Sequence, residues 1–112
     1  MCGITGYLQF GGGNSISESI LKEMLRSLHH RGPDEAGIYI DDHIGLAHAR
    51  LSIIDLKSGQ QPMSSISDRY WIVFNGEIFN YIELKDELIK KGFHFRTTSD
   101  TEVLLNLYVA YG

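Results

Sequence analysis

Three helix-start signatures divide this sequence and limit where its strands can lie. Serine or asparagine is followed three residues later by glutamate at 15–18, 80–83 and 99–102, which is the spacing of a capping box at a helix N-terminus. Apolar residues at helical spacing follow each signature, so we predict helices after residues 15, 80 and 99. The first helix, of about three turns, would bury a stripe made of Ile16, Ile20, Leu21, Met24, Leu25 and Leu28.

The ends of these helices are also marked in the sequence. Glycine and proline within residues 30–35 cannot continue the first helix. Gly92 suits the position after the second helix, and Lys90 and Lys91 suit its C-terminal dipole. The third helix is expected to bury one face, which consists of Val103, Leu104, Leu107, Tyr108 and Tyr111.

The segments between the helices are typical of strands. Residues 3–10 predict a strand that closes at a glycine-rich turn. Residues 37–40 and 44–48, joined by a polar tip, predict a hairpin. Residues 51–56 are a further apolar segment, and 70–74 are a continuous apolar run that predicts a fully buried strand. This order indicates an α+β fold with fewer strands than are needed to cover both faces of its sheet.

The length, net charge and cysteine content limit the number of domains and the classes of function that this chain can have. A length of 112 residues allows one domain at most. The formal net charge of −4, with scattered arginines, argues against a nucleic-acid partner. The single cysteine excludes an intramolecular disulfide, and a reactive thiol suits a reducing compartment. Because neither a signal peptide, nor a membrane-spanning run, nor metal-ligand spacing among the histidines is recognisable, we expect a cytoplasmic protein without a membrane partner or a metal.

Cys2 directly follows the initiator Met1. Removal of Met1 would place a thiol and a free α-amine on one residue. The neutral amine can then accept the thiol proton without a partner histidine, which would make Cys2 a nucleophile. The alternative is that Cys2 is an ordinary small residue that opens a strand.

Other positions carry the groups that a cysteine attacking an amide would need. Asn75 and Gly76 offer an amide and an approachable backbone N–H for an oxyanion, although Asn-Gly is also the commonest hairpin turn. Arg50 can bind a carboxylate with its forked guanidinium, or it can simply reach solvent. Asp100 can hold an ammonium group, or it can serve the start of the third helix.

Six blocks of the sequence occur in an order that is typical of one family. They read MCGI at 1–4, HRGPD at 30–34, GLAHARLSIID at 45–55, QPM at 61–63, FNGEIFNY at 74–81 and TSDTE at 98–102. From end to end, the chain resembles the N-terminal glutaminase domain of glutamine-hydrolysing asparagine synthetases. That domain is a class II glutamine amidotransferase with the N-terminal-nucleophile hydrolase fold, so the resemblance implies an enzyme.

The resemblance implies a catalytic role for three residues. Cys2, exposed when Met1 is removed, would be the nucleophile, with its own α-amine as the base. The Asn75 side chain and the Gly76 N–H would form the oxyanion hole. The reaction would be the hydrolysis of L-glutamine to glutamate and ammonia.

The resemblance also implies how L-glutamine would be bound. Arg50 would hold its α-carboxylate, and Glu77 and Asp100 would hold its α-ammonium group. Four consecutive residues would supply the backbone and walls of the pocket: Leu51, Ser52, Ile53 and Ile54.

The family's glutaminase domain continues beyond the third helix and completes an αββα sandwich. Residues 1–112 are therefore expected to form the N-terminal part of that domain, as an incomplete sandwich that is marginally stable or forms a homo-oligomer. The family's synthetase domain, which uses ATP and Mg, would be a partner domain or subunit, and no cofactor is expected in this chain. Two alternatives stay open. One is the glutaminase module of another class II amidotransferase, of the sugar-phosphate, phosphoribosyl or glutamate synthase type. The other is an inactive truncated fragment that acts only as a binding module.

Overall fold

The computed structural model describes residues 2–11, 16–51 and 59–112. Helices and strands are mixed in blocks, as the predicted α+β class requires. No helix in these described ranges has the length and apolar character to cross a membrane. The elements follow one another as β1 (Gly3–Leu8), α1 (Glu18–Ser27), β2 (Glu35–Ile40), β3 (Ile44–Arg50), β4 (Met63–Ser64), β5 (Trp71–Ile72), α2 (Tyr81–Lys90) and α3 (Asp100–Tyr111).

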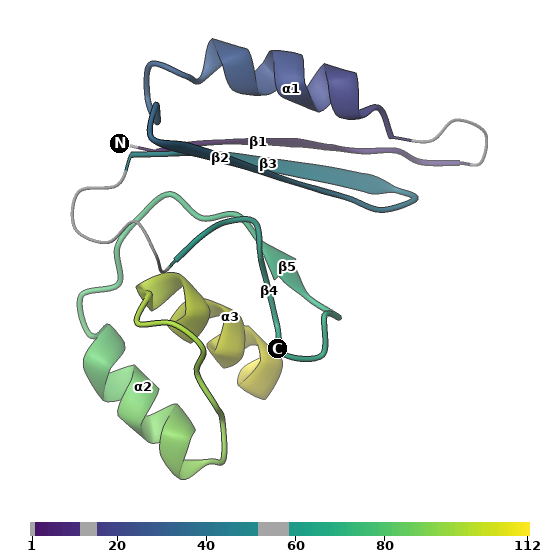
Figure 1. Ribbon diagram of the computed structural model, residues 1–112. Helices are drawn as coiled ribbons and strands as arrows, with labels where there is room; N and C mark the ends of the chain where they lie inside the picture. Colours follow the sequence, from purple (N-terminus) through teal and green to yellow (C-terminus); the bar gives the residue numbers. More distant parts are fainter. Residues whose placement is uncertain (1, 12–15, 52–58) are drawn as a thin grey trace.

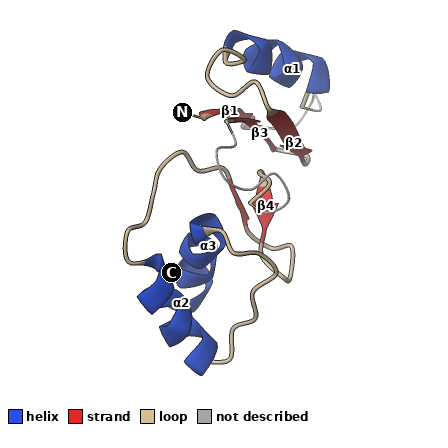
Figure 2. Cartoon of the chain, turned by 60° about the vertical axis from the view of Figure 1, so that its left-hand side comes forward, coloured by secondary structure: helices blue, strands red, loops and turns tan. Residues whose placement is uncertain are grey.

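The elements are stacked in layers (Figure 1). α1 covers one face of a three-stranded sheet of order β1-β3-β2, while β4, β5, α2 and α3 lie on the other side of that sheet. Turning the molecule keeps the two helices α2 and α3 farthest from α1 (Figure 2). We call residues 2–51 the N-terminal unit and residues 59–112 the C-terminal unit. On the sheet face turned away from α1, Ile4 and Leu8 remain 44% and 53% exposed.

The hydrophobic core of the N-terminal unit lies between α1 and the sheet. Its buried members are Ile16, Leu21, Leu25, Ala47 and Ala49. The predicted stripe on the first helix is partly wrong, because Leu21 and Leu25 face the sheet and Ile20 is 50% exposed. The predicted cap residue Ser15 lies outside the described residues. Ser17 caps α1 instead, and its side chain accepts a hydrogen bond from the Ile20 N–H.

β3 is the central strand and pairs antiparallel with both neighbours. The predicted hairpin is confirmed as β2 and β3, each slightly longer than expected. At one end of the sheet Gly3 lies opposite Ala49, and Glu35 lies opposite Arg50. At the hairpin tip, Asp41 accepts backbone hydrogen bonds that lower the pKa of its carboxyl.

The apolar run at 70–74 does not form the fully buried strand that was predicted. Only Trp71 and Ile72 pair, as β5, with the equally short β4, and both residues are half-buried. The side chains of this run diverge, since Trp71 stacks on Tyr39 at 3.8 Å while Tyr70 packs edge-on against Tyr108 at 5.3 Å. A strand with a single two-residue partner cannot bury both of its faces.

α2 and α3 begin where the sequence predicts. Ser99 caps α3 by accepting a hydrogen bond from the Thr101 N–H at 3.1 Å. Asn80 precedes α2, but its side chain makes no capping bond. Gly92 follows the last residues of α2 with a φ of +98°, the left-handed conformation expected there.

Glu102 differs from the capping-box prediction. It is 2% exposed, and its carboxylate accepts hydrogen bonds from the Arg96 N–H at 2.8 Å and from the Thr97 N–H and hydroxyl at 2.7 Å each. These bonds fold the segment before α3 onto the helix and let polar residues take buried positions. The predicted buried face is therefore only partly right, because Val103 is buried as expected whereas Tyr108 and Tyr111 are exposed. The other buried residues of α3 are Thr101, Glu102, Leu105 and Asn106.

Candidate functional site

Cys2 lies at the end of the sheet where β3 finishes. Since Gly3 pairs with Ala49, the residue before Gly3 is placed beside Arg50 and Leu51. The Leu51 N–H points at the Cys2 sulfur, with a nitrogen–sulfur distance of 3.5 Å, and the Leu51 carbonyl oxygen is 3.9 Å from the same sulfur. Arg31 donates from Nε to the Cys2 carbonyl oxygen at 3.2 Å. The thiol is half-buried and held between backbone groups.

Arg50 is the last residue of β3, and its side chain does not simply reach solvent. Its Nη1 lies 3.1 Å from Oε2 of Glu35, the residue opposite it on β2, and the two side chains are 14% and 28% exposed. A guanidinium has five N–H donors in a planar fork, so it can bind one carboxylate while another orients it. Glu35 therefore fixes a cation at the end of β3, on the residue that precedes Leu51.

The start of α3 lies close to Arg50. A Cβ atom at Gly59 would lie 3.2 Å from the Ser99 hydroxyl oxygen and 3.5 Å from Nη2 of Arg50. Gly59 is thus between the two, and Asp100 follows Ser99 directly. The carboxylate Oδ2 of Asp100 accepts a hydrogen bond from the Ile78 N–H at 3.0 Å.

Asn75, Gly76 and Glu77 lie in the exposed loop between β5 and α2. The chain runs from this loop into a helix, so Asn75-Gly76 is not the turn of a hairpin. The ring of Phe74 packs against Gly76, where a Cβ would lie 2.8 Å from it. In Figures 1 and 2 the loop passes beside the end of the sheet at which β1 begins, the end that carries Cys2.

His48 joins the sheet to this loop. It is 1% exposed and lies on the sheet face opposite α1, where it forms a hydrogen bond with the backbone of Phe74. Burial lowers the pKa of His48, and the bond to Phe74 acts in the opposite direction. Its Nε2 is buried without a hydrogen-bond partner among the described residues. A neutral imidazole at this position is consistent with both observations.

The structure thus gathers the predicted residues into two sets. Cys2, Arg50 and Leu51 are in contact or adjacent at the end of β3. The loop residues 75–77 and Asp100 form the second set, which His48 and Gly59 bring to the same end of the sheet. The predicted pocket residues Ser52, Ile53 and Ile54 lie outside the described residues.

Sequence reasoning missed several residues that position this site. Arg31, His48 and Gln61 all belong to the sequence blocks quoted above, and Glu35 follows one of them directly. Their presence in those blocks was the available signal. The sequence does not indicate which group each of these side chains contacts.

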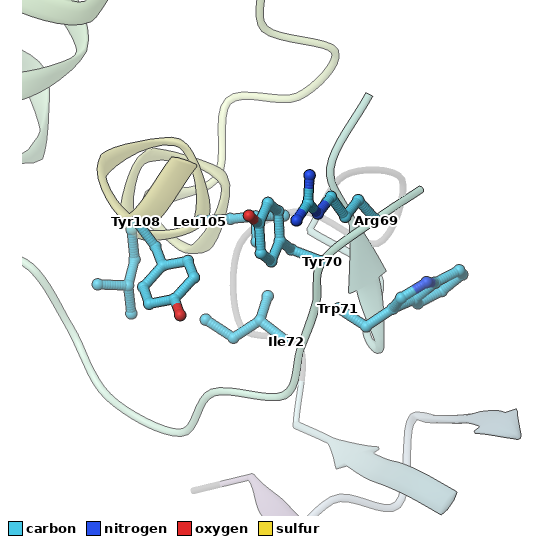
Figure 3. A pocket seen from close by; sticks show the side chains of 7 residues that line it. Arg69, Tyr70, Trp71, Ile72, Leu105 and Tyr108 are labelled. Atoms are coloured by element: carbon cyan, nitrogen blue, oxygen red, sulfur yellow. The ribbon is translucent and has the colours of Figure 1, made fainter. Parts of the chain in front are cut away.

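A cavity of about 510 Å³ lies elsewhere, between β5 and α3 (Figure 3). Its walls are mainly aromatic and aliphatic, with Tyr70, Ile72, Leu105 and Tyr108 among them and Arg69 at the side. None of the predicted site residues lines it, and it holds no nucleophile or carboxylate. We therefore place the candidate site at the end of β3. In the described ranges, no group of three or more histidine, cysteine, aspartate or glutamate side chains is arranged to hold a metal ion.

Comparison with known proteins places this geometry in a family. Residues 1–112 match the family described as "Glutamine amidotransferase domain". Asparagine synthetase [glutamine-hydrolyzing] 1 of Bacillus subtilis (strain 168) is 48% identical over 113 residues, covering 99% of this chain and 18% of the relative. Asparagine synthetase [glutamine-hydrolyzing] 2 of Oryza sativa subsp. japonica is 42% identical, and asparagine synthetase [glutamine-hydrolyzing] 1 of Arabidopsis thaliana is 41% identical.

Both plant matches cover 100% of this chain and 19% of the relative. The chain therefore spans about a fifth of the length of these curated relatives. The resemblance inferred from the six blocks is confirmed along all 112 residues. The thiol beside Arg50 is accordingly a feature of a chain that belongs to the glutamine amidotransferase domain family.

Proposed function

We propose that this chain hydrolyses L-glutamine to glutamate and ammonia, with Cys2 as the nucleophile. The observation that carries the proposal is the position of the Cys2 sulfur, 3.5 Å from the nitrogen of Leu51, the residue that follows Arg50. A thiol and a fixed guanidinium at the same end of the sheet can meet a substrate that has both an amide and a carboxylate. Free glutamine has both, and the family to which the chain belongs supports this choice of substrate.

The chemistry needs only the thiol, the α-amine of Cys2 after removal of Met1, and water. The amine accepts the thiol proton and the sulfur attacks the side-chain amide carbon of glutamine, forming a C–S bond and an oxyanion. The C–N bond then breaks, and the leaving nitrogen takes the proton to depart as ammonia. Water attacks the resulting thioester, the C–S bond breaks, and glutamate and the free thiol are released.

The oxyanion would be stabilised by two donors, the Asn75 side-chain amide and the Gly76 N–H. Both lie in a loop that reaches the end of the sheet carrying Cys2. Donors that are fixed before the reaction stabilise the developing charge without reorganisation at the moment of attack. The bonds that hold Phe74 and Ile78 on either side of this loop support that role.

Glutamine would be oriented by its charged end. Arg50, already aligned by Glu35, would bind the α-carboxylate through its planar fork. Asp100 and Glu77 would face the α-ammonium group. The backbone and side chains of Leu51, Ser52, Ile53 and Ile54 would complete the pocket.

The ammonia would be delivered to a synthetase domain or subunit that makes asparagine with ATP and Mg. The similarity to glutamine-hydrolysing asparagine synthetases supports this choice of acceptor. Residues 1–112 would then be the N-terminal part of an αββα sandwich. The order α1, three-stranded sheet, β4 with β5, and α2 with α3 supports that arrangement.

The proposal is tested by alkylation with 6-diazo-5-oxo-norleucine, a glutamine-shaped reagent, on the protein in its full natural length. We expect one adduct by intact mass, located on Cys2 by peptide mapping and suppressed by excess glutamine. The same spectrum reports whether Met1 is removed. Modification elsewhere, or modification that glutamine does not suppress, would contradict the assignment.

A further inference from the structure

We propose that Gln61 is a positioning residue that holds the oxyanion-hole loop to the start of α3. The inference rests on the proposed function, because it concerns where Asn75 and Gly76 are placed. Gln61 is not among the residues assigned above to substrate or to the reacting atoms. Its side chain is half-buried and acts through two hydrogen bonds to other groups.

The two ends of the Gln61 amide bind two different parts of the site. Oε1 accepts a hydrogen bond from the Phe74 N–H at 2.5 Å, and Nε2 donates to the Thr101 hydroxyl oxygen at 3.2 Å. Phe74 immediately precedes Asn75, and Thr101 immediately follows Asp100. One amide thus connects the segment with the oxyanion donors to the segment with the ammonium-binding carboxylate.

Among the described residues no strand pairing reaches this loop, and side chains hold it instead. β5 ends at Ile72, so the Phe74 N–H has no ladder partner and is bound by Gln61. On its other side the Phe74 backbone is bound by His48. Further along, the Ile78 N–H is bound by Asp100. The loop from 74 to 78 is therefore fixed near both ends by the first turn of α3, directly through Asp100 and indirectly through Gln61.

Gln61 is itself anchored through its backbone. β2 passes so close to it at Gly37 that a Cβ atom there would clash with the Gln61 carbonyl oxygen. The amide side chain therefore extends from a backbone position that is packed against β2 of the N-terminal unit. A group held in this way can set the position of its neighbour, whereas an unanchored glutamine would only follow it.

The test uses Gln61→Met, which keeps the length of the side chain and removes both hydrogen bonds. The matched control is Gln60→Met, the same change at the neighbouring exposed glutamine. Because the oxyanion donors would be displaced and not deleted, we expect kcat for glutamine hydrolysis to fall about 10- to 100-fold. KM should stay within about 2-fold of the value for the unchanged protein. The rate of Cys2 alkylation by iodoacetamide should also stay within about 2-fold, because this reaction needs no oxyanion hole. For Gln60→Met, all of these values should stay within the same range.

A double-mutant cycle separates positioning from a general structural effect. If Gln61 acts through Asn75, Gln61→Met should cost less than about 3-fold in kcat when Asn75 is already alanine. An equal loss in both backgrounds, or no loss relative to Gln60→Met, would overturn the inference. If Gln61→Met does not fold, Thr101→Val removes one of the two bonds, and a loss of about 3- to 10-fold with the same dependence on Asn75 is expected.

These outcomes also distinguish the inference from the function on which it rests. If the unchanged protein and Cys2→Ala release ammonia from glutamine equally slowly, the proposed function fails. If the unchanged protein is active, Cys2→Ala is inactive and Gln61→Met equals Gln60→Met, only the role of Gln61 fails.

Discussion

The N-terminal and C-terminal units are held together by different kinds of interaction. In the N-terminal unit, two continuous antiparallel ladders and a core between α1 and the sheet fix the backbone. In the C-terminal unit the only described ladder is the two-residue pairing of β4 with β5, and the carboxylates and amides of Gln61, Asp100 and Glu102 fix the loops. The proposed nucleophile and the arginine proposed to bind the carboxylate belong to the first unit, and the proposed oxyanion donors belong to the second. The proposed site thus combines a cysteine held by a strand ladder with donors whose position depends on a few polar side chains.

The largest effect is expected from Cys2→Ala, a change at the end of the rigid unit. Loss of the nucleophile should lower glutamine hydrolysis by at least about 10⁴-fold. The thermal unfolding midpoint should not change, because Cys2 adds no packing to the core. Ammonia release measured with the purified protein checks the first statement, and residual activity clearly above about one ten-thousandth of that of the unchanged protein would contradict it.

Asn75→Ala tests the donors in the C-terminal unit. Removing one oxyanion donor should lower kcat by about 10²–10³-fold and leave KM largely unchanged, because the donor acts on charge that develops during the reaction. Steady-state kinetics with glutamine supply both constants. A kcat equal to that of the unchanged protein would remove Asn75 from the mechanism.

Leu21→Ala tests the core of the N-terminal unit. Leu21 is 0% exposed between α1 and the sheet, so truncation should lower the free energy of unfolding by about 2–5 kcal/mol. Urea unfolding measures the loss, and Ile20→Ala on the exposed side of the same helix is the control. Similar losses at both positions would contradict the assignment of Leu21 to the buried face of α1 and of Ile20 to its exposed face.

Glu102→Gln tests the polar interactions of the C-terminal unit. The added NH₂ group would face N–H donors that the carboxylate now accepts, and we expect a loss of about 1–3 kcal/mol. Amide hydrogen exchange should become faster in α3 and the segment before it, while β3 stays protected. Faster exchange in both units to the same degree would mean that they unfold as one.

The smallest effect concerns the pH dependence of His48. Because burial lowers the pKa of His48 in the folded protein, the unfolded state binds more protons as the pH falls through the ordinary range of histidine. The free energy of unfolding should therefore decrease as the pH falls below about 6.5. The slope should be smaller than the slope expected if the unfolded state bound one full extra proton. His48→Gln should flatten this part of the curve, as urea unfolding at several pH values would show; an unchanged slope would assign it to other groups.

The same difference between the units explains how much could be predicted from the sequence. Periodicity and turn residues located β1, the hairpin of β2 and β3, and the starts of α2 and α3. The prediction of a buried strand at 70–74 was wrong. The predicted face of α3 was right at Val103 but wrong at Tyr108 and Tyr111, because tertiary hydrogen bonds let Glu102 and Thr101 take buried positions. Cys2 and Arg50 could be singled out from residue type and motif. Glu35 and Gln61 could not be assigned, since their roles depend on partners 15 and 13 positions away in the chain.

The close approach at Gly37 has a consequence for recombination between relatives. A side chain there would first meet the carbonyl oxygen and carbon of Gln61 and then Cδ of Pro62, so the space at the crossing of β2 over Gln61 is limited chiefly by main-chain atoms. A chimera that takes one side of this crossing from a relative should therefore keep the crossing only if glycine is retained at position 37 and the backbone at Gln61 keeps its path. Gly37→Ala should disturb it, because the added Cβ atom would clash with the Gln61 carbonyl oxygen.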